Sequence, residues 1–238
     1  MTAPRRCALV LGGSGYVGRE VVRALAAEGV TTRFTCHKRR DEALALADET
    51  GARAEPIDLR DIAAIRALVA HLDEEGALPD VVIHCAVVGG SEPLAEVTDE
   101  LWDRMHAVNV RAIHVLVQAL VPRLAGRAAD IVIAAALDGI RDVPSSAHFA
   151  STQAALLGMT RALASELGPR DVRVNLCLLG ALGGGISSAI DPSRLADYKK
   201  FSAFGRVGSP AEASRAIARL ALHNRWMTGS ILPVTGGL

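Results

Sequence analysis

Short apolar runs alternate with longer amphipathic stretches along the whole chain. The short runs are rich in Val, Ile and Leu and are bounded by glycine or polar residues, which is typical of strands buried on both faces of a sheet. In the longer stretches apolar residues recur every three to four positions, which predicts helices. We expect strands at residues 7–11, 32–36, 53–57, 81–87, 131–136, 173–179 and 230–233, with helices centred near Val22, Leu46, Ile65, Val110, Leu157 and Ile217.

This order of elements predicts an α/β protein. Strands that alternate with helices pair in parallel, because each helix returns the chain to the same end of the sheet. No repeat, low-complexity tract or linker divides the 238 residues. We therefore expect residues 1–238 to form a single domain, a doubly wound parallel sheet of about seven strands with helices on both faces.

Charge and composition exclude several classes of function. The chain has 26 Lys and Arg against 26 Asp and Glu, so it has no global field that attracts nucleic acid or anionic lipid. No apolar run approaches the roughly 20 residues of a membrane span. Cys7, Cys36, Cys85 and Cys177 show no CxxC pairing, so we expect buried thiols rather than a disulfide or a metal site. We expect a cytoplasmic protein without nucleic-acid or membrane partners.

A glycine-rich segment follows the first expected strand and opens the first helix. Glycine in such a segment permits a tight turn and lets backbone N–H groups approach a pyrophosphate at the positive end of the helix. An ordinary strand-to-helix turn is the alternative, but such a turn does not require so many glycines. The segment therefore predicts a Rossmann-like dinucleotide site made by Gly12, Gly13, Ser14, Gly15, Tyr16, Val17 and Gly18.

The residues after the second expected strand favour one form of nicotinamide cofactor. An NAD-binding fold places an acidic residue about 20 residues past the glycines, but here Lys38, Arg39 and Arg40 precede the first acid, Asp41. Cations at this point suit the additional phosphate of NADP, and a solvated surface loop is the alternative. We expect NADP(H) to bind in preference to NAD(H), with Lys38 and Arg39 near that phosphate.

The fifth expected strand and the helix after it carry a family resemblance. From residue 154 the sequence AALLGMTRALASELGPRDVRVN resembles the catalytic segment of the short-chain dehydrogenase/reductase family, closest to its β-ketoacyl carrier-protein reductases. The resemblance places Ala136 at the family's catalytic serine, Phe149 at its tyrosine and Gln153 at its lysine. Asn109 matches the asparagine that holds a water in the family's proton relay; a structural role at a helix kink is the alternative that we favour.

The resemblance implies further cofactor contacts and an assembly. Asp58 and Leu59 match the family's adenine-binding element, and Gly180 lies in the loop beside the nicotinamide. Ala86 is the one residue retained from the family motif Asn-Asn-Ala-Gly, in which Val87 replaces the glycine. Family members form dimers and tetramers, so we expect an oligomer, made of identical chains or shared with another short-chain reductase.

The replaced side chains argue against ordinary ketone reduction. Phe149 cannot donate a proton, Ala136 cannot form a side-chain hydrogen bond and Gln153 carries no charge. Loss of acid catalysis costs ~10²–10⁴ in rate and loss of an oxyanion donor a further ~10²–10³. Asp138 and His148 are the candidate substitutes, since both lie in the same segment and imidazoles titrate near neutral pH. Loop and helix-start residues without a catalytic role are the alternative for both.

Three functions remain open. Our leading hypothesis is a non-catalytic subunit, a pseudoenzyme that assembles with an active relative in fatty-acid or polyketide biosynthesis, where acyl carrier protein holds the substrate. The second hypothesis is a repurposed enzyme, NADP(H)-dependent or non-redox, that reduces a conjugated bond or performs dehydration, isomerisation or cyclisation, with Asp138 or His148 as acid or base. The third is an NADP(H)-responsive regulatory protein.

Overall fold

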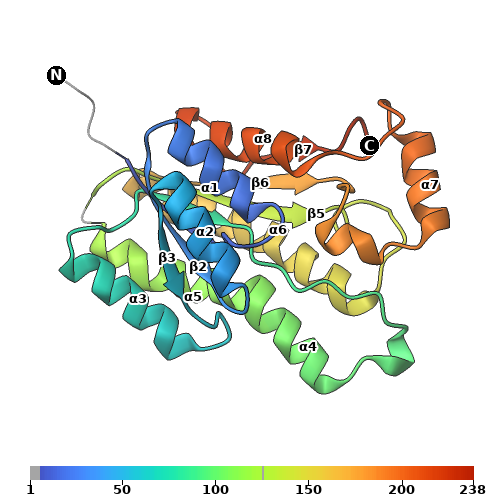
Figure 1. Ribbon diagram of the computed structural model, residues 1–238, viewed down its shortest axis with the longest axis horizontal. Coiled ribbons are helices and arrows are strands. Elements are labelled where there is room, and N and C mark those ends of the chain that lie inside the picture. The colour runs from blue at the N-terminus through green and yellow to red at the C-terminus, as the bar shows by residue number, and fades with distance from the viewer. Residues whose placement is uncertain (1–5, 125) are drawn as a thin grey trace.

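The computed structural model describes residues 6–124 and 126–238, and these form one seven-stranded sheet with helices on both sides (Figure 1). The strand order is β3-β2-β1-β4-β5-β6-β7, and all neighbouring strands pair in parallel. The strands are β1 (Cys7–Leu11), β2 (Thr31–Cys36), β3 (Arg53–Pro56), β4 (Val81–His84), β5 (Ala129–Ala136), β6 (Val172–Leu179) and β7 (Ile231–Val234). The chain order reverses between β1 and β4, which places a crevice at the carboxyl ends of these strands.

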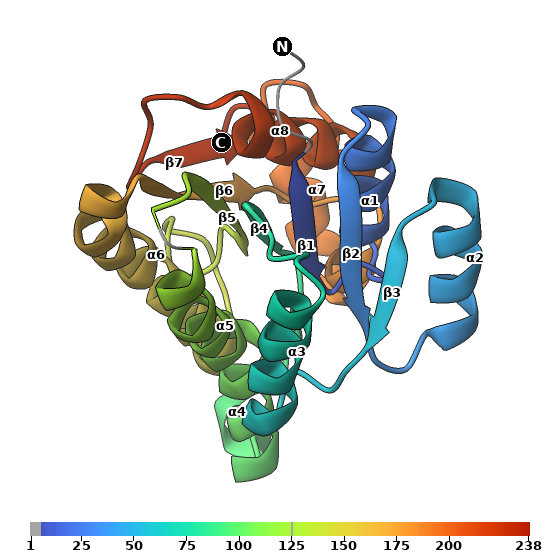
Figure 2. The same ribbon diagram turned by 90° about the vertical axis from the view of Figure 1, so that its left-hand side faces the viewer.

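A hydrophobic core lies on each side of the sheet, where the strands pack against the covering helices. In Figure 2, α1, α2 and α8 lie on one side of the sheet and α3, α5 and α6 on the other. The helices are α1 (Gly18–Ala27), α2 (Arg40–Thr50), α3 (Ile62–Glu74), α4 (Asp99–His106), α5 (Ala112–Leu120), α6 (Ala147–Leu167), α7 (Pro192–Phe201) and α8 (Pro210–His223). No helix in the described ranges combines the length and apolar character needed to cross a membrane.

Local capping chemistry explains where several helices begin. Asp61 accepts a hydrogen bond from the backbone N–H of Ala64 at 3.1 Å and caps α3. Ser209 and Glu212 form a reciprocal capping box at the start of α8, with Pro210 in the first helical position. These short polar signals fix the helix boundaries, and the buried faces then fix the packing.

Strand β4 is shorter than the sequence predicts, and the expectation of residues 81–87 was wrong at its end. The backbone N–H of Cys85 still bonds to the carbonyl of Leu11 at 2.9 Å, but the chain then leaves the sheet. It does so where it passes the glycine-rich segment: a Cβ atom on Gly12 would lie 2.6 Å from the Cα atom of Ala86. The end of β4 therefore contributes a loop, not a strand, to the crevice.

Two helical segments near the crevice differ from the helices expected from the sequence. A π-helical turn, Ala107–Arg111, joins α4 to α5 at the position where a single helix centred near Val110 was expected. A short 3₁₀ turn, Gly185–Ala189, and α7 form a lid after β6. None of the α7 side chains is buried, so the lid helix has no periodic apolar face by which a sequence pattern could reveal it.

Candidate functional site

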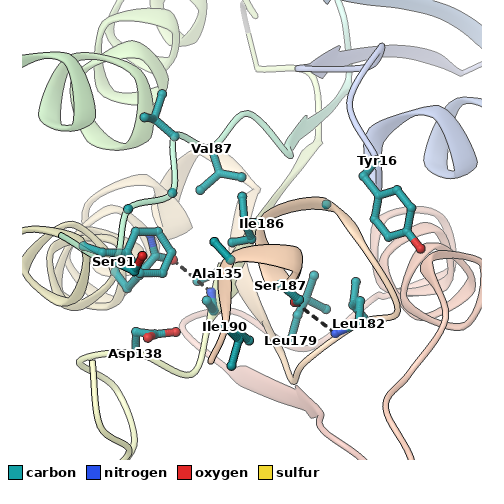
Figure 3. A pocket seen from close by; sticks show the side chains of 18 of the residues that line it. Tyr16, Val87, Ser91, Ala135, Asp138, Leu179, Leu182, Ile186, Ser187 and Ile190 are labelled. Carbon is teal, nitrogen blue, oxygen red and sulfur yellow. Dashed lines mark hydrogen bonds between the residues drawn. The ribbon is translucent and has the colours of Figure 1, made fainter. Parts of the chain in front are cut away.

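A cleft of about 2080 Å³ lies at the carboxyl ends of the strands. Its walls are the glycine-rich loop after β1, the loops after β2, β3, β4 and β5, the start of α6, and the lid (Figure 3). One end of the cleft is polar and basic. The other end, under the lid, has apolar side chains with carboxylates among them.

The glycine-rich loop packs so closely that side chains are excluded from it. Gly12 has φ +75°, and Cβ atoms on Gly13 and Gly18 would lie 2.4 Å from Phe34 Cβ and 2.2 Å from the carbonyl oxygen of Gly12. The turn is held by the N–H of Gly15, which donates to Gly12 at 2.9 Å. The glycines therefore serve a tight strand-to-helix turn that brings the backbone to the floor of the cleft.

The first turn of α1 is suited to an anionic ligand. Val17, at the helix N-cap, has no side-chain cap. The N–H groups of Arg19 and Glu20 donate to the carbonyls of Gly15 and Val17 at 3.0 and 3.1 Å, so the N–H groups left for solvent or a ligand are those of the turn that leads into the helix. The helix macrodipole adds partial positive charge at the same point. This end of α1 opens into the cleft through Ser14, Tyr16 and Val17, which is the arrangement that binds a pyrophosphate.

The basic edge of the cleft follows β2. Lys38 and Arg39 line the cleft and make no ion pair with any residue that the structure describes. Asp58 lines it as well, and Arg60 holds the carboxylate through two charge-assisted hydrogen bonds of 2.6 and 2.9 Å. This pairing lowers the pKa of Asp58 to about 2, so the carboxylate is ionised at neutral pH. A phosphate beside Lys38 and Arg39 would meet unneutralised cations.

The remaining predicted cofactor residues complete this wall. Leu59, Ala86 and Gly180 all line the cleft. Gly180 is constrained by its neighbours, because a Cβ atom there would lie 2.0 Å from the hydroxyl oxygen of Tyr198. Every residue predicted to bind the cofactor is thus at the cleft surface except Gly13 and Gly18, which support the turn from behind. The residues present fit a dinucleotide with an additional phosphate.

The three positions that carry the family's catalytic groups also line the cleft. The side chains of Ala136 and Phe149 have no hydrogen-bonding atom, and Gln153 carries no charge. Phe149 is buried in the wall. Gln153 is 1% exposed; its Oε1 accepts the backbone N–H of Ala136 at 2.9 Å, and its Nε2 donates to the hydroxyl of Thr152 at 3.1 Å. Gln153 therefore ties α6 to the end of β5.

Asn109 occupies the π-helical turn and is fully buried. Its Oδ1 accepts the N–H of Val88 at 2.7 Å, while its Nδ2 donates to the Val88 carbonyl at 3.0 Å and to the Thr152 hydroxyl at 3.1 Å. The backbone carbonyl of Asn109 lies 2.9 Å from His84 Nε2. The side chain thus connects the loop after β4 to α6.

The structure separates the two candidate acid–base residues. Asp138 is half-buried and lines the cleft. His148 is 1% exposed and is not part of the lining; its Nε2 lies 3.2 Å from Glu92 Oε2. Direct proton transfer from His148 to a substrate would have to pass through Glu92, because adjacent helical residues point about 100° apart and Phe149 takes the cleft-facing direction. A catalytic role of His148 stays a prediction with this restriction.

The lid residues make contacts across the cleft that the sequence pattern alone does not reveal. The ring of Tyr16 lies against Gly184 and Gly185, and Ile186 packs against Gly89 on the opposite wall. Figure 3 shows Ile186 between Tyr16 and Val87. The signal was present as a run of three glycines after β6, which is unusual unless something bulky lies close to it.

Tyr198 anchors the lid at its other end. Its hydroxyl donates to the carbonyl of Thr235 at 2.6 Å, and burial raises the pKa of the phenol. The phenol is therefore a neutral hydrogen-bond donor that is already engaged with the backbone after β7. Lid and C-terminal segment are joined by this contact.

Burial disfavours the thiolate form of two of the cysteines. All four are free thiols, and burial raises the pKa of both Cys85 and Cys177 to about 12. Thiols with such pKa values are protonated at neutral pH and are poor nucleophiles and poor metal ligands. No group of His, Cys, Asp and Glu within the described ranges is placed to hold a metal ion.

Comparisons with known proteins agree with this geometry. Residues 14–238 match the family model described as enoyl-(acyl carrier protein) reductase. The chain is 32% identical to the cyclic-di-GMP-binding biofilm dispersal mediator protein of Escherichia coli, over 96% of this chain and 94% of that protein. It is 25% identical to the 3-oxoacyl-[acyl-carrier-protein] reductase of Chlamydia muridarum, over 98% and 97%.

Solved structures give the same assignment. A short-chain dehydrogenase from Burkholderia cenocepacia in complex with NADP superposes with a TM-score of 0.89 at 28% identity, covering 98% of this chain and 97% of that one. The strand order, the glycine-rich turn and the family match over residues 14–238 all favour the same assignment. The chain belongs to the short-chain dehydrogenase/reductase family.

Proposed function

We propose that this protein is an NADP(H)-dependent oxidoreductase whose reaction does not use the family's proton donor. The observation that carries the proposal is the cleft of about 2080 Å³, in which an intact dinucleotide cradle faces positions occupied by Ala136, Phe149 and Gln153. An open cleft favours an enzyme over a scaffold. The replaced positions restrict the chemistry to reactions that need no proton at the reacting oxygen.

The cradle supports NADP(H) as the cofactor. The N–H groups of the turn into α1 would hold the pyrophosphate, Lys38 and Arg39 would hold the additional phosphate, and Asp58 with Leu59 would border the adenine. Solved relatives are described as complexes with NADPH or NADP. When bound, the nicotinamide supplies a hydride; the chain orients it and excludes water with Val87, Leu179 and Ile186.

Cofactor titration tests the first half of the proposal. We expect calorimetry to show NADPH binding, and the Lys38→Ala/Arg39→Ala variant to weaken it by about 10- to 100-fold, since hydrogen bonds to charged groups contribute about 1.5–3 kcal/mol. NADH binding by the same variant should change little. Arg104→Ala, which removes an exposed cation from α4, is the matched control. Absence of NADPH binding by the wild-type protein would refute the proposal.

Turnover of a simple keto thioester tests the second half. We expect the wild-type protein to show no detectable reduction of the thioester with NADPH. The Ala136→Ser/Phe149→Tyr/Gln153→Lys variant restores the family's proton donor and oxyanion partner, so its rate of reduction should exceed the detection limit by at least ~10². Efficient ketone reduction by the wild-type protein would show that another group supplies the proton.

A non-catalytic subunit is the second candidate, favoured by the intact fold beside a fully replaced catalytic set. In this case the chain assembles with an active reductase that acts on acyl-carrier-protein substrates, as its named relatives do. Co-expression with an active relative distinguishes this candidate: mixed oligomers with altered partner activity support it, and homomers alone oppose it.

A regulatory role is the third candidate, and it is favoured by the 32% identity to a protein named for cyclic-di-GMP binding. In this case NADP(H) or a second nucleotide would set the binding state of the chain without turnover.

We assign the protein to the cytoplasm, which the four free thiols support.

A further inference from the structure

The charges in the cleft are divided between its two ends. Cations mark the cofactor end, at Lys38 and Arg39. At the substrate end, formed by the loops after β4 and β5 and by the lid, one cation, Arg194, faces five carboxylates in the described lining. The five are Glu92, Asp138, Asp142, Asp191 and Asp197. A polyanionic substrate or carrier is disfavoured at this end, and a cationic one is favoured.

Most of these carboxylates have other tasks or lie in solvent. Glu92 pairs with His148, Asp191 caps α7 through Ser193, and Asp142 and Asp197 are exposed. Asp138 differs from all of them. It is half-buried, lies two residues beyond Ala136, and makes no hydrogen bond or ion pair with any residue in the described ranges.

The position of Asp138 is fixed by a rigid turn. The carbonyl of Leu137 accepts hydrogen bonds from the N–H groups of Ile140 at 3.0 Å and Arg141 at 2.8 Å. Gly139 has φ +68°, and a Cβ atom there would lie 2.3 Å from the carbonyl oxygen of Ala150, so the turn is pressed against the first turn of α6. Leu137 itself is buried in the core. The turn therefore holds the Asp138 carboxylate in a fixed position at the surface of the cleft.

Apolar side chains make up much of the cleft wall near Asp138, and no cation in the described ranges pairs with its carboxylate. Figure 3 shows it on the side of Ser91 and Ala135, across the cleft from Tyr16, with Ile186 and Ile190 from the lid between. Phe149, Leu179 and Val143 complete the wall. A partly desolvated anion in such a site binds an organic cation more strongly than a neutral molecule of the same shape.

We propose that the substrate of this site is an apolar iminium ion, which Asp138 binds as its counter-ion. The inference rests on the proposed function and names its substrate class. Reduction of an iminium ion needs a hydride and no proton: two electrons form the new C–H bond, the C=N π pair becomes the lone pair of a neutral amine, and NADPH is oxidised to NADP⁺. A ketone would leave an alkoxide, which Ala136 and Phe149 cannot stabilise or protonate.

The charge of Asp138 predicts a specific kinetic signature. The positive charge on the substrate is lost during reduction, so the carboxylate stabilises the bound iminium ion more than the transition state. Asp138 therefore contributes to substrate binding and not to the chemical step. Its removal should raise KM and leave kcat unchanged or somewhat higher.

Two probes of the same ring size test the inference, one positively charged and one neutral. The first is the 2-methyl-3,4-dihydroisoquinolinium ion, whose charge no proton loss can remove, and the second is the neutral ketone 1-tetralone. Calorimetry in the presence of NADP⁺ should show binding of the iminium ion, weakened about tenfold in Asp138→Asn. Asp48→Asn, which removes an exposed carboxylate from α2, should bind the ion as the wild type does. NADPH oxidation should accompany the iminium ion and not the ketone.

The outcomes separate this inference from the proposed function. Loss of NADPH binding refutes the proposed function and the inference with it. NADPH binding together with equal affinity for both probes, or an Asp138→Asn variant with unchanged iminium affinity, refutes the inference alone. A melting temperature of Asp138→Asn equal to that of the wild type establishes that the isosteric change has not disturbed the turn.

Discussion

Gln153 shows how one residue converts a catalytic position into a structural one. Its amide bridges the end of β5 and Thr152, and Thr152 is in turn bonded to Asn109. An amide can accept and donate at once, whereas an ammonium group only donates. The backbone N–H of Ala136 is therefore satisfied by Gln153 in a way that lysine could not provide, which makes the replacement compatible with a stable α6.

His84 carries a testable pH dependence at the same scale. It is 1% exposed, its Nε2 bonds to Asn109, and its Nδ1 has no partner among the described residues. Burial lowers its pKa from 6.5 to about 4. Between these values the unfolded chain binds a proton that the folded chain does not, so the free energy of unfolding should fall as the pH falls from 6.5 to about 4, by about 1.4 kcal/mol per pH unit.

Urea denaturation of the wild type and of His84→Gln at several pH values in this window measures the effect. Glutamine keeps a donor near Asn109 but does not titrate. The difference between the two proteins should disappear above pH 6.5 apart from a constant offset. Parallel stability curves would mean that His84 takes up its proton in the folded state as readily as in the unfolded one.

At the scale of elements, the lid depends on a match between two segments far apart in sequence. Gly184 has φ 166°, an extended conformation that any residue adopts, yet a Cβ atom there would lie 2.8 Å from the ring of Tyr16. Space, not backbone conformation, requires glycine at this position. At Gly185, with φ +66°, both reasons apply. The ring of Tyr16 therefore occupies the space that side chains at positions 184 and 185 would need.

A double-mutant cycle tests this match. Gly184→Thr should lower the free energy of unfolding by about 1–3 kcal/mol, the range for overpacking, and should expose the lid to limited proteolysis. Tyr16→Gly removes the obstacle, so the double variant should recover most of the loss. Additive effects in the cycle would show that the ring and the glycine do not share this space.

The same elements show what a sequence pattern can and cannot reveal. The central strands β1, β4, β5 and β6 are mostly apolar and buried, whereas the edge strands β3 and β7 are partly exposed. The positions of all seven were predicted within a few residues, and the glycine-rich turn followed from its context. The side chain of His148 was not placed by sequence, because its direction depends on how α6 meets Glu92. The π-helical turn at Asn109 does not change the helical spacing of apolar residues, and the polar lid helix has no such spacing. Contacts of this kind are set by tertiary packing.

At the scale of the whole molecule, the exposed face of α6 is the part that invites a second chain. Ala154, Gly158, Ala162 and Ser165 are exposed and recur at helical spacing along this face. Small side chains let another helix approach closely. The family's assembly and our second candidate function both need such a surface, whether it is covered by an identical chain or by an active relative.

Gly158 allows this surface to be tested without disturbing the fold. A Cβ atom on Gly158 would meet nothing within 4 Å in the single chain, so Gly158→Arg should leave the melting temperature of a monomer nearly unchanged while it blocks a closely packed helix. We expect light scattering after gel filtration to show an oligomer for the wild type and a smaller species for Gly158→Arg. Gly158→Ala, which adds a single methyl group, is the control and should remain assembled. An oligomer that survives the arginine must use another face, since a helix packed over Gly158 has no room for that side chain.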